Sequence, residues 1–219
     1  MSFPQPTRIL AIRHGETAWN VDTRIQGHLD IPLNDTGRRQ AQRLAAALAD
    51  EPLHAVYSSD LSRAHQTATA LAGAIGLPVR AVPGLRERAC GHVAGRPFRE
   101  IDAQWPAPAP RGRPRDPDVG PAGGESLTSF YARVIEQAQT LATAHAGQTI
   151  ALVAHGGVLD CLYRAATRVD LKAPRTWELA NASINRLLHT PEGFTLVGWA
   201  DTQHLQDLAL DEFADGATR

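Results

Sequence analysis

Two short apolar runs, far apart in the sequence, each end in a histidine followed by glycine. Residues 9–12 (Ile-Leu-Ala-Ile) precede Arg13-His14-Gly15, and residues 150–154 (Ile-Ala-Leu-Val-Ala) precede His155-Gly156. Short apolar runs with such flanks are typical of buried strands. We therefore expect two strands, each followed by one histidine at the edge of the sheet where the strand ends.

Strand patterns alternate with helix patterns along most of the chain. Expected strands cover residues 8–12, 55–58, 79–82, 149–153, 183–188 and 194–199, and expected helices cover 36–50, 62–75, an apolar stripe over 127–141, and 158–167. Ser62 is a candidate cap for the second helix. This alternation predicts an α/β fold with three layers, doubly wound, in which helices cover both faces of a mainly parallel central sheet.

The chain of 219 residues is long enough for one domain with a sizeable core, so we expect a single domain over 1–219. A stretch at about 105–124 holds six of the fifteen prolines and should be a loop. The net charge of −1 gives no reason to expect a nucleic-acid partner, and no apolar run is long enough for a membrane span. We expect a cytoplasmic protein, in which the glycosylation sequon at 181–183 is accidental; a homo-oligomer remains open.

His14 and its neighbours suggest phosphoryl transfer. A histidine attacks phosphorus only through an unprotonated ring nitrogen, and nearby cations favour the neutral ring. Arg13 is adjacent, and Arg63 follows the expected strand at 55–58. Guanidinium groups bind phosphate oxygens bidentately and stabilise the charge of the transferring group. His155 would add a further donor, which makes a phosphohistidine intermediate the favoured interpretation.

Glu87 is the candidate general acid, because a leaving alkoxide needs a proton. A bound phosphate close by would favour its protonated form. Glu87 could instead make a structural ion pair with Arg86 or Arg88. His14, Arg63, Glu87 and His155 each follow an expected strand, and the carboxyl ends of the strands form the ligand crevice in such sheets.

With these residues in place, the chain resembles the histidine phosphatase superfamily, the phosphoglycerate-mutase-like proteins, and its phosphatase branch in particular. The similar blocks are Arg13-His14-Gly15-Glu16-Thr17-Ala18-Trp19-Asn20, then residues 24–30, 33–37, 58–68, 123–126 and 153–157. Together they extend over roughly residues 7 to 205. Each block is weak alone, but their common order and spacing make the resemblance specific.

The resemblance implies a role for each matching residue. His14 would be the nucleophile, Arg13, Arg63 and His155 would complete the phosphate pocket, and Glu87 would donate the proton. The residues that would contact the phosphoryl group or substrate are Asn20, Gln26, Gly27 and Gly156. No metal is implied. Family members often have a glycine-tryptophan-acid run shortly after the acid, whereas this chain has Gly-His-Val-Ala-Gly at 91–95.

Three functions remain compatible with these residues. The first is hydrolysis of a small phosphomonoester, without a cofactor. The second is a phosphoglycerate mutase, which returns the phosphoryl group to another hydroxyl and would need a 2,3-bisphosphoglycerate primer. The third is a non-catalytic protein that binds phosphorylated ligands. Dedicated mutases carry a longer insertion after the acid, and its absence here favours the phosphatase.

Overall fold

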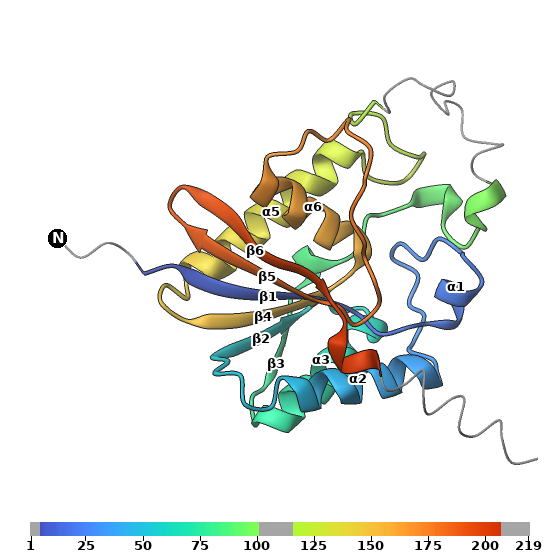
Figure 1. Cartoon of the computed structure of the whole chain (residues 1–219). Coiled ribbons are helices and arrows are strands. Elements are labelled where there is room, and N and C mark those ends of the chain that lie inside the picture. Colours follow the sequence, from blue (N-terminus) through green and yellow to red (C-terminus); the bar gives the residue numbers. More distant parts are fainter. Residues whose placement is uncertain (1–4, 101–115, 207–219) are drawn as a thin grey trace, which may run out of the picture.

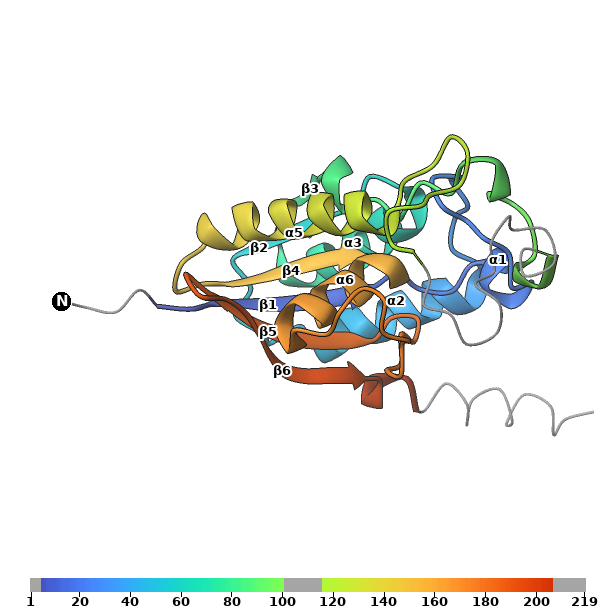
Figure 2. The ribbon, with the colours of Figure 1, turned by 90° about the horizontal axis from the view of Figure 1, so that it is seen from above.

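A single six-stranded sheet forms the centre of the computed structural model of this chain, which describes residues 5–100 and 116–206 (Figure 1). The strands are β1 (Thr7–Arg13), β2 (Ala55–Ser58), β3 (Val79–Ala81), β4 (Thr149–Ala154), β5 (Ile184–Thr190) and β6 (Gly193–Asp201). They lie in the order β3-β2-β4-β1-β5-β6, and most of this order can be followed across the sheet in Figure 2.

The sheet is mainly parallel, as the alternating pattern predicts. β3, β2, β4 and β1 run in the same direction, whereas β5 is antiparallel to β1 and pairs with β6 in a hairpin. β4 and β1 are the two central strands, and the middle of β1, from Ile9 to Ile12, is apolar and buried. All six residues of β4 are buried, which is expected of a parallel strand covered on both faces.

Four long helices cover the two faces of the sheet, α5 and α6 on one side and α2 and α3 on the other (Figure 1). They are α2 (Asp35–Ala47), α3 (Ser62–Ile75), α5 (Leu127–Thr143) and α6 (Gly156–Thr167). Side chains alternate along each strand, so Ile9 and Ala11 pack under α5 and α6, while Leu10 and Ile12 face α2 and α3. The three-layer α/β fold is therefore confirmed.

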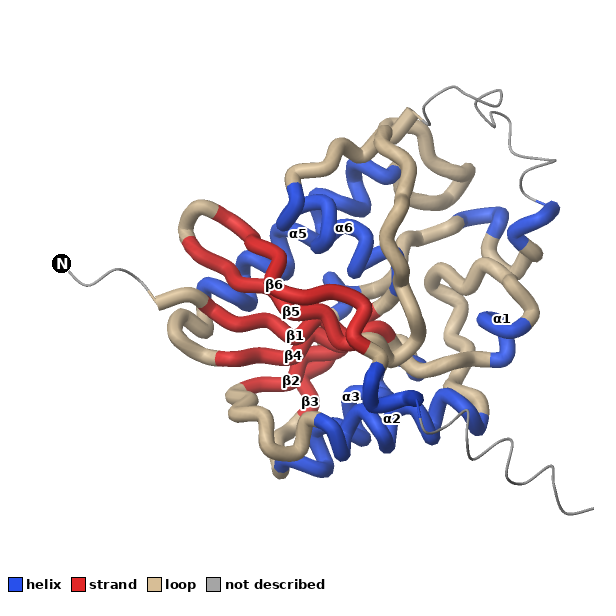
Figure 3. The backbone as a smooth tube through the Cα atoms, viewed as in Figure 1, coloured by secondary structure: helices blue, strands red, loops and turns tan. Residues whose placement is uncertain are grey.

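Further short elements are α1 (Ala18–Val21) and the 3₁₀ turns η1 (Pro83–Leu85), η2 (Gly91–Val93) and η3 (Gln203–Leu205); residues 98–100 are also helical. Figure 3 shows that α1 and its flanking loops lie beyond one end of the strands. Residues 105–115 of the expected proline-rich loop lie outside the described residues, and 116–124 form turns and irregular backbone without a helix or strand.

The prediction that Ser62 caps α3 is wrong by one residue. Ser62 is the first helical residue, and Leu61, which precedes it, provides no side-chain cap. Asp30 takes this function from a distant loop, because its carboxylate accepts hydrogen bonds from the Ser62 amide and hydroxyl, both at 2.7 Å. A cap supplied from 32 residues away leaves no local pattern in the sequence.

The loop after β1 packs directly on the first turn of α2. The Glu16 carbonyl accepts a bond from the Asn34 amide at 3.0 Å, and the Glu16 amide donates to the Gln40 side chain at 2.8 Å. A Cβ atom at Gly37 would lie 2.0 Å from the Glu16 carbonyl oxygen, which is too close for any residue but glycine.

We therefore expect Gly37→Ala to lower the free energy of unfolding by about 2–3 kcal/mol or more, because backbone must move to admit the methyl group. Gly73→Ala is the matched control: Gly73 lies in α3 with open space around its Cβ position. That substitution should stabilise the protein by up to about 1 kcal/mol through helix propensity. Urea denaturation measures both, and equal effects would contradict the packing described.

Candidate active site

His14 follows β1 directly and lies almost fully buried beside the end of β4. Its backbone amide donates to the Ala154 carbonyl at 2.9 Å. Its Nδ1 lies 2.7 Å from the Gly15 carbonyl oxygen, which can only accept, so Nδ1 carries the hydrogen. In the neutral ring Nε2 then has a free lone pair, as a nucleophile requires.

The surroundings of His14 keep its ring neutral. Burial lowers the pKa of His14 well below its usual value, and the positive charges of Arg13 and Arg63 lower it further. The bond to the Gly15 carbonyl opposes this shift only in part. Near neutral pH the ring is therefore unprotonated, so that it can attack an electrophile without first losing a proton.

Arg13 and Arg63 contribute two guanidinium groups from different elements. Arg13 ends β1 and donates to the Leu179 carbonyl. Arg63 lies in the first turn of α3, is fully buried, and donates to the carbonyls of Gly27 at 2.8 Å and Leu29 at 2.9 Å. Burial lowers the pKa of Arg63 to about 10, so it stays charged at neutral pH. The Nε atoms of both arginines are buried and have no partner among the described residues.

His155 follows β4 as His14 follows β1, and the centres of the two rings are 5.2 Å apart. The residue is fully buried, and neither ring nitrogen has a hydrogen-bond partner in the described part of the chain. Burial lowers the pKa of His155 well below its usual value, and Arg63 and His14 add to this effect. A buried polar ring without partners is costly unless a ligand supplies them.

Glu87 lies after η1 and points to the start of α6. Its carboxylate accepts bonds from the Gly157 amide at 2.9 Å and the Arg88 amide at 2.8 Å. Its negative charge raises the pKa of both Arg13 and Arg63, which places it within electrostatic reach of the cationic groups.

The ion pair of Glu87 with Arg86, one of the two alternatives for Glu87, is replaced by a pair of Arg86 with Asp60. The Arg86 guanidinium binds the Asp60 carboxylate through two hydrogen bonds, at 2.7 and 2.5 Å. Arg133 from α5 holds the Glu87 segment in place, since it donates to the Glu87 carbonyl at 3.3 Å and pairs with Glu125 at 2.8 Å. The Glu87 carboxylate accepts its hydrogen bonds from the backbone amides of Gly157 and Arg88.

The other residues expected at the site are placed around this cluster. Gly27 has a positive φ of 52° and accepts from Arg63, while Gln26 is buried and its side-chain oxygen has no partner among the described residues. Gly156 begins α6, and a Cβ there would lie 3.6 Å from the Arg13 Nε. Asn20 lies in α1, and Asn181 links it to the His14 carbonyl.

Sequence reasoning missed two contributors to the site. The Gly157 amide donates to Glu87, and a Cβ atom at Gly157 would lie 2.1 Å from the Glu87 carboxylate oxygen, so a larger residue would displace that carboxylate. The only signal for it is the second glycine after His155. Asn181 was set aside as part of a chance sequon, although its side chain donates to the His14 carbonyl at 3.0 Å.

The arrangement suits one kind of ligand. Two guanidinium groups and a second imidazole converge on a neutral, oriented imidazole, and several of their buried nitrogens have no partner among the described residues. A tetrahedral oxyanion offers acceptors for such donors and charge for the arginines. A phosphoryl group near the His14 Nε2 fits these requirements.

The family model described as histidine phosphatase superfamily (branch 1) matches residues 9–202. The chain belongs to this superfamily. This family assignment agrees with the resemblance that the sequence blocks carry, and the fold agrees with that of solved family members.

Relatives of the chain carry both phosphatase and mutase-like names. Phosphoglycerate mutase-like protein 4 of Arabidopsis thaliana is 38% identical over 215 residues, which cover 96% of this chain and 92% of that protein. A metal-independent phosphoserine phosphatase of the same plant is 35% identical, with 93% and 85% covered. A solved mycobacterial glucosyl-3-phosphoglycerate phosphatase is 32% identical, with a TM-score of 0.79 over 89% of this chain and 99% of that one.

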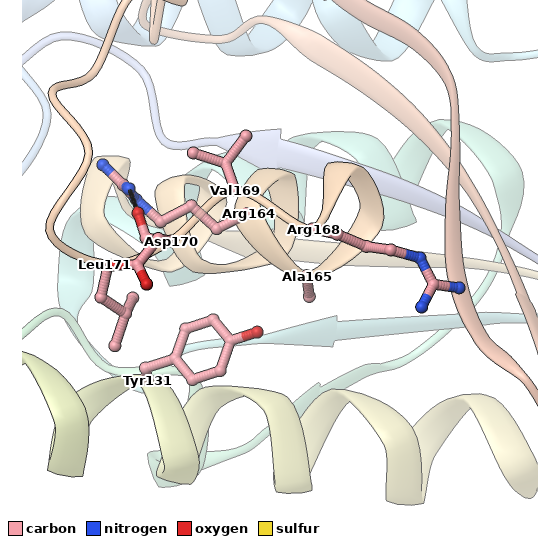
Figure 4. A pocket seen from close by; sticks show the side chains of 7 residues that line it. All are labelled: Tyr131, Arg164, Ala165, Arg168, Val169, Asp170 and Leu171. Carbon is pink, nitrogen blue, oxygen red and sulfur yellow. Dashed lines mark hydrogen bonds between the residues drawn. The ribbon is translucent and has the colours of Figure 1, made fainter.

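In residues 5–100 and 116–206, no group of three or more histidine, cysteine, aspartate or glutamate side chains is placed to hold a metal ion. None of the described helices combines the length and apolar character needed to cross a bilayer. A hollow of about 370 Å³ lies between α5 and the end of α6, away from the predicted site residues; its lining includes Tyr131, Arg164 and Arg168 (Figure 4).

The two buried histidines of this superfamily member should make its stability depend on pH. Both have a folded-state pKa below that of the unfolded chain. As the pH falls below about 6.5, the unfolded chain therefore binds protons that the folded protein does not, and stability is lost. In phosphate-free buffer, the free energy of unfolding should fall between pH 7 and 5.5 by up to about 1.4 kcal/mol per pH unit for each histidine.

The control for this prediction is His155→Gln, which removes one of the two groups. Urea denaturation at several pH values should give this variant a shallower loss of stability on acidification than the wild type. A slope identical to that of the wild type would show that His155 is not held neutral in the folded protein.

Proposed function

We propose that the chain is a phosphomonoester hydrolase that acts through a phosphohistidine at His14 on a small phosphorylated metabolite. The observation that carries the proposal is the set of buried nitrogens of Arg13, Arg63 and His155 that have no partner in the described part of the chain and that surround a neutral His14 whose Nδ1 hydrogen is fixed. The proposal also includes a single domain over 1–219, a cytoplasmic location and no need for a metal or other cofactor.

The proposed reaction has two steps. The His14 Nε2 lone pair attacks phosphorus, the ester P–O bond breaks, and the leaving oxygen takes a proton from the Glu87 carboxyl. The Glu87 carboxylate then removes a proton from water, whose oxygen attacks phosphorus as the N–P bond breaks. Arg13, Arg63 and His155 would stabilise the charge on the equatorial oxygens, and Asn20 would donate a further hydrogen bond.

The names of the relatives support a small substrate with a phosphate ester. One relative is named for phosphoserine and one solved structure for glucosyl-3-phosphoglycerate, so both names describe hydrolysis of a phosphorylated small molecule. The name of the phosphoglycerate mutase-like relative keeps the second function open for this chain. The same phosphohistidine would serve both, and a 2,3-bisphosphoglycerate primer would be required only by the mutase.

A direct comparison of the two activities tests the proposal. We expect the purified protein to release phosphate from p-nitrophenyl phosphate and from members of a phosphomonoester panel that includes phosphoserine. With 3-phosphoglycerate and a bisphosphoglycerate primer, we expect little isomerised product. Primer-dependent isomerisation with little phosphate release would establish the mutase instead, and no turnover together with phosphate binding would favour the non-catalytic function.

Glu87→Gln tests the general acid. Alkyl phosphates have poor leaving groups and need the proton, so their turnover should fall about 10²–10⁴-fold, whereas p-nitrophenyl phosphate should lose less than about tenfold. Glu178→Gln is the matched control, because Glu178 is exposed and, among the described residues, it is its backbone carbonyl that accepts a hydrogen bond, from Trp199. Equal losses for aryl and alkyl phosphates would rule out the proton-donor role of Glu87.

A further inference from the structure

Residues 169–182 connect α6 to β5, and we call this segment the strap. Its first half is fixed by Arg164, whose guanidinium donates to the carbonyls of Asp170 and Ala173; Figure 4 shows the side chain turned toward Asp170. Its second half is fixed by Trp177, which stacks on Tyr163 with ring centres 4.0 Å apart. The strap is thus anchored on α6 before it reaches the active site.

The end of the strap reaches the backbone of the nucleophile. Asn181 donates one side-chain hydrogen to the His14 carbonyl at 3.0 Å and the other to the Asn20 Oδ1 at 3.3 Å. The next residue, Ala182, donates its amide to the carbonyls of Arg13 at 3.1 Å and His14 at 3.2 Å. Both hydrogens of the Asn181 amide are therefore used, each on a residue of the site.

These contacts also determine which way the Asn20 amide faces. Its Oδ1 accepts bonds from the Thr17 amide and the Thr17 hydroxyl, both at 3.0 Å, in addition to the bond from Asn181. The Thr17 backbone amide can only donate, so the Asn20 atom that it approaches is the oxygen, because an NH₂ group could not accept this bond. The NH₂ group of Asn20 must then point away from Thr17 and Asn181, where it is available as a donor.

We propose that Asn181 is a positioning residue for catalysis, which holds the carbonyl of His14 and orients the Asn20 amide as a donor to the phosphoryl group. The inference rests on the proposed function, because it assigns Asn181 to the same reaction. Asn181 does not touch the substrate; it acts through His14 and Asn20. Glycosylation at this sequon would modify the very nitrogen that makes both bonds, so the two uses of Asn181 exclude each other.

A double-mutant cycle tests this role by turnover. We expect Asn181→Ala to lower kcat/KM for p-nitrophenyl phosphate roughly tenfold in the wild-type background. In the Asn20→Ala background, the same change should cost about threefold or less, because only the contact with His14 remains to be lost. Thr176→Ala, an exposed change elsewhere on the strap, is the control and should leave kcat/KM unchanged. Equal losses in the two backgrounds would overturn the proposed link through Asn20.

A second measurement does not depend on turnover. The ¹⁵N side-chain NH₂ signals of Asn20, assigned by their loss in Asn20→Ala, should shift when inorganic phosphate is added to the wild-type protein. In Asn181→Ala this response should shrink, and phosphate should bind roughly tenfold more weakly. Asn181→Asp keeps the shape of the side chain but sets an oxygen against two oxygens, so it should bind phosphate no better than Asn181→Ala.

The two measurements separate the inference from the function on which it rests. A wild-type protein without phosphatase activity, but with an Asn20 response that depends on Asn181, would refute the hydrolase and keep the positioning role. A protein that hydrolyses phosphomonoesters, with an unchanged Asn20 response and phosphate affinity in folded Asn181→Ala and Asn181→Asp, would refute the positioning role alone. Thermal unfolding establishes that the variants are folded.

Discussion

The parallel pairing of β1 with β4 is the interaction on which the active site depends. Arg13 pairs with Ala154 in the register of these two strands, so the next residue of each strand is a histidine at the same edge of the sheet. The hydrogen bond from the His14 amide to the Ala154 carbonyl extends the ladder by one step. A slip of one residue would reverse the faces of the side chains along β1 and separate the two rings.

Burying several cationic groups around this pair of strands is energetically costly. Arg13, Arg63 and two histidines lie together, and because the histidines remain neutral, only the two arginines carry positive charge. The arginines stay charged and are satisfied in part by backbone carbonyls of Gly27, Leu29 and Leu179. The guanidinium nitrogens that lack a hydrogen-bond partner would bind an anionic ligand most strongly, because it offers both acceptors and negative charge.

Much of this site can be predicted from the sequence because its principal residues follow strands. His14, Arg63 and His155 come directly or shortly after apolar runs, and parallel strands bring such positions to one edge. The helices α2, α3, α5 and α6 follow from their apolar periodicity; the bounds of α3 are the expected ones, and one or both ends of the other three differ by a few residues. The family blocks then order these elements into one known fold.

Contacts between loops could not be predicted in the same way. Asp30 caps α3 from another segment, Gly157 receives Glu87 through its backbone, and Asn181 reaches His14 from the strap. Each of these contacts joins residues that share no periodic pattern, and the sequence around Asn181 matched an unrelated motif. The antiparallel direction of β5 likewise depends on the long strap before it. The strap brings the chain back to the edge of the sheet where β1 ends, so β5 begins beside Ile12 and runs opposite to β1.

The central claim is that His14 carries the phosphoryl group during turnover. Its most direct test is rapid acid-free quenching of the reaction with p-nitrophenyl phosphate, followed by peptide mass spectrometry under alkaline conditions that preserve phosphohistidine. The account predicts a phosphoryl group on His14, formed within a single turnover and absent from His14→Ala. A phosphoryl group on His155 or another residue, or full turnover without any phosphoenzyme, would contradict it.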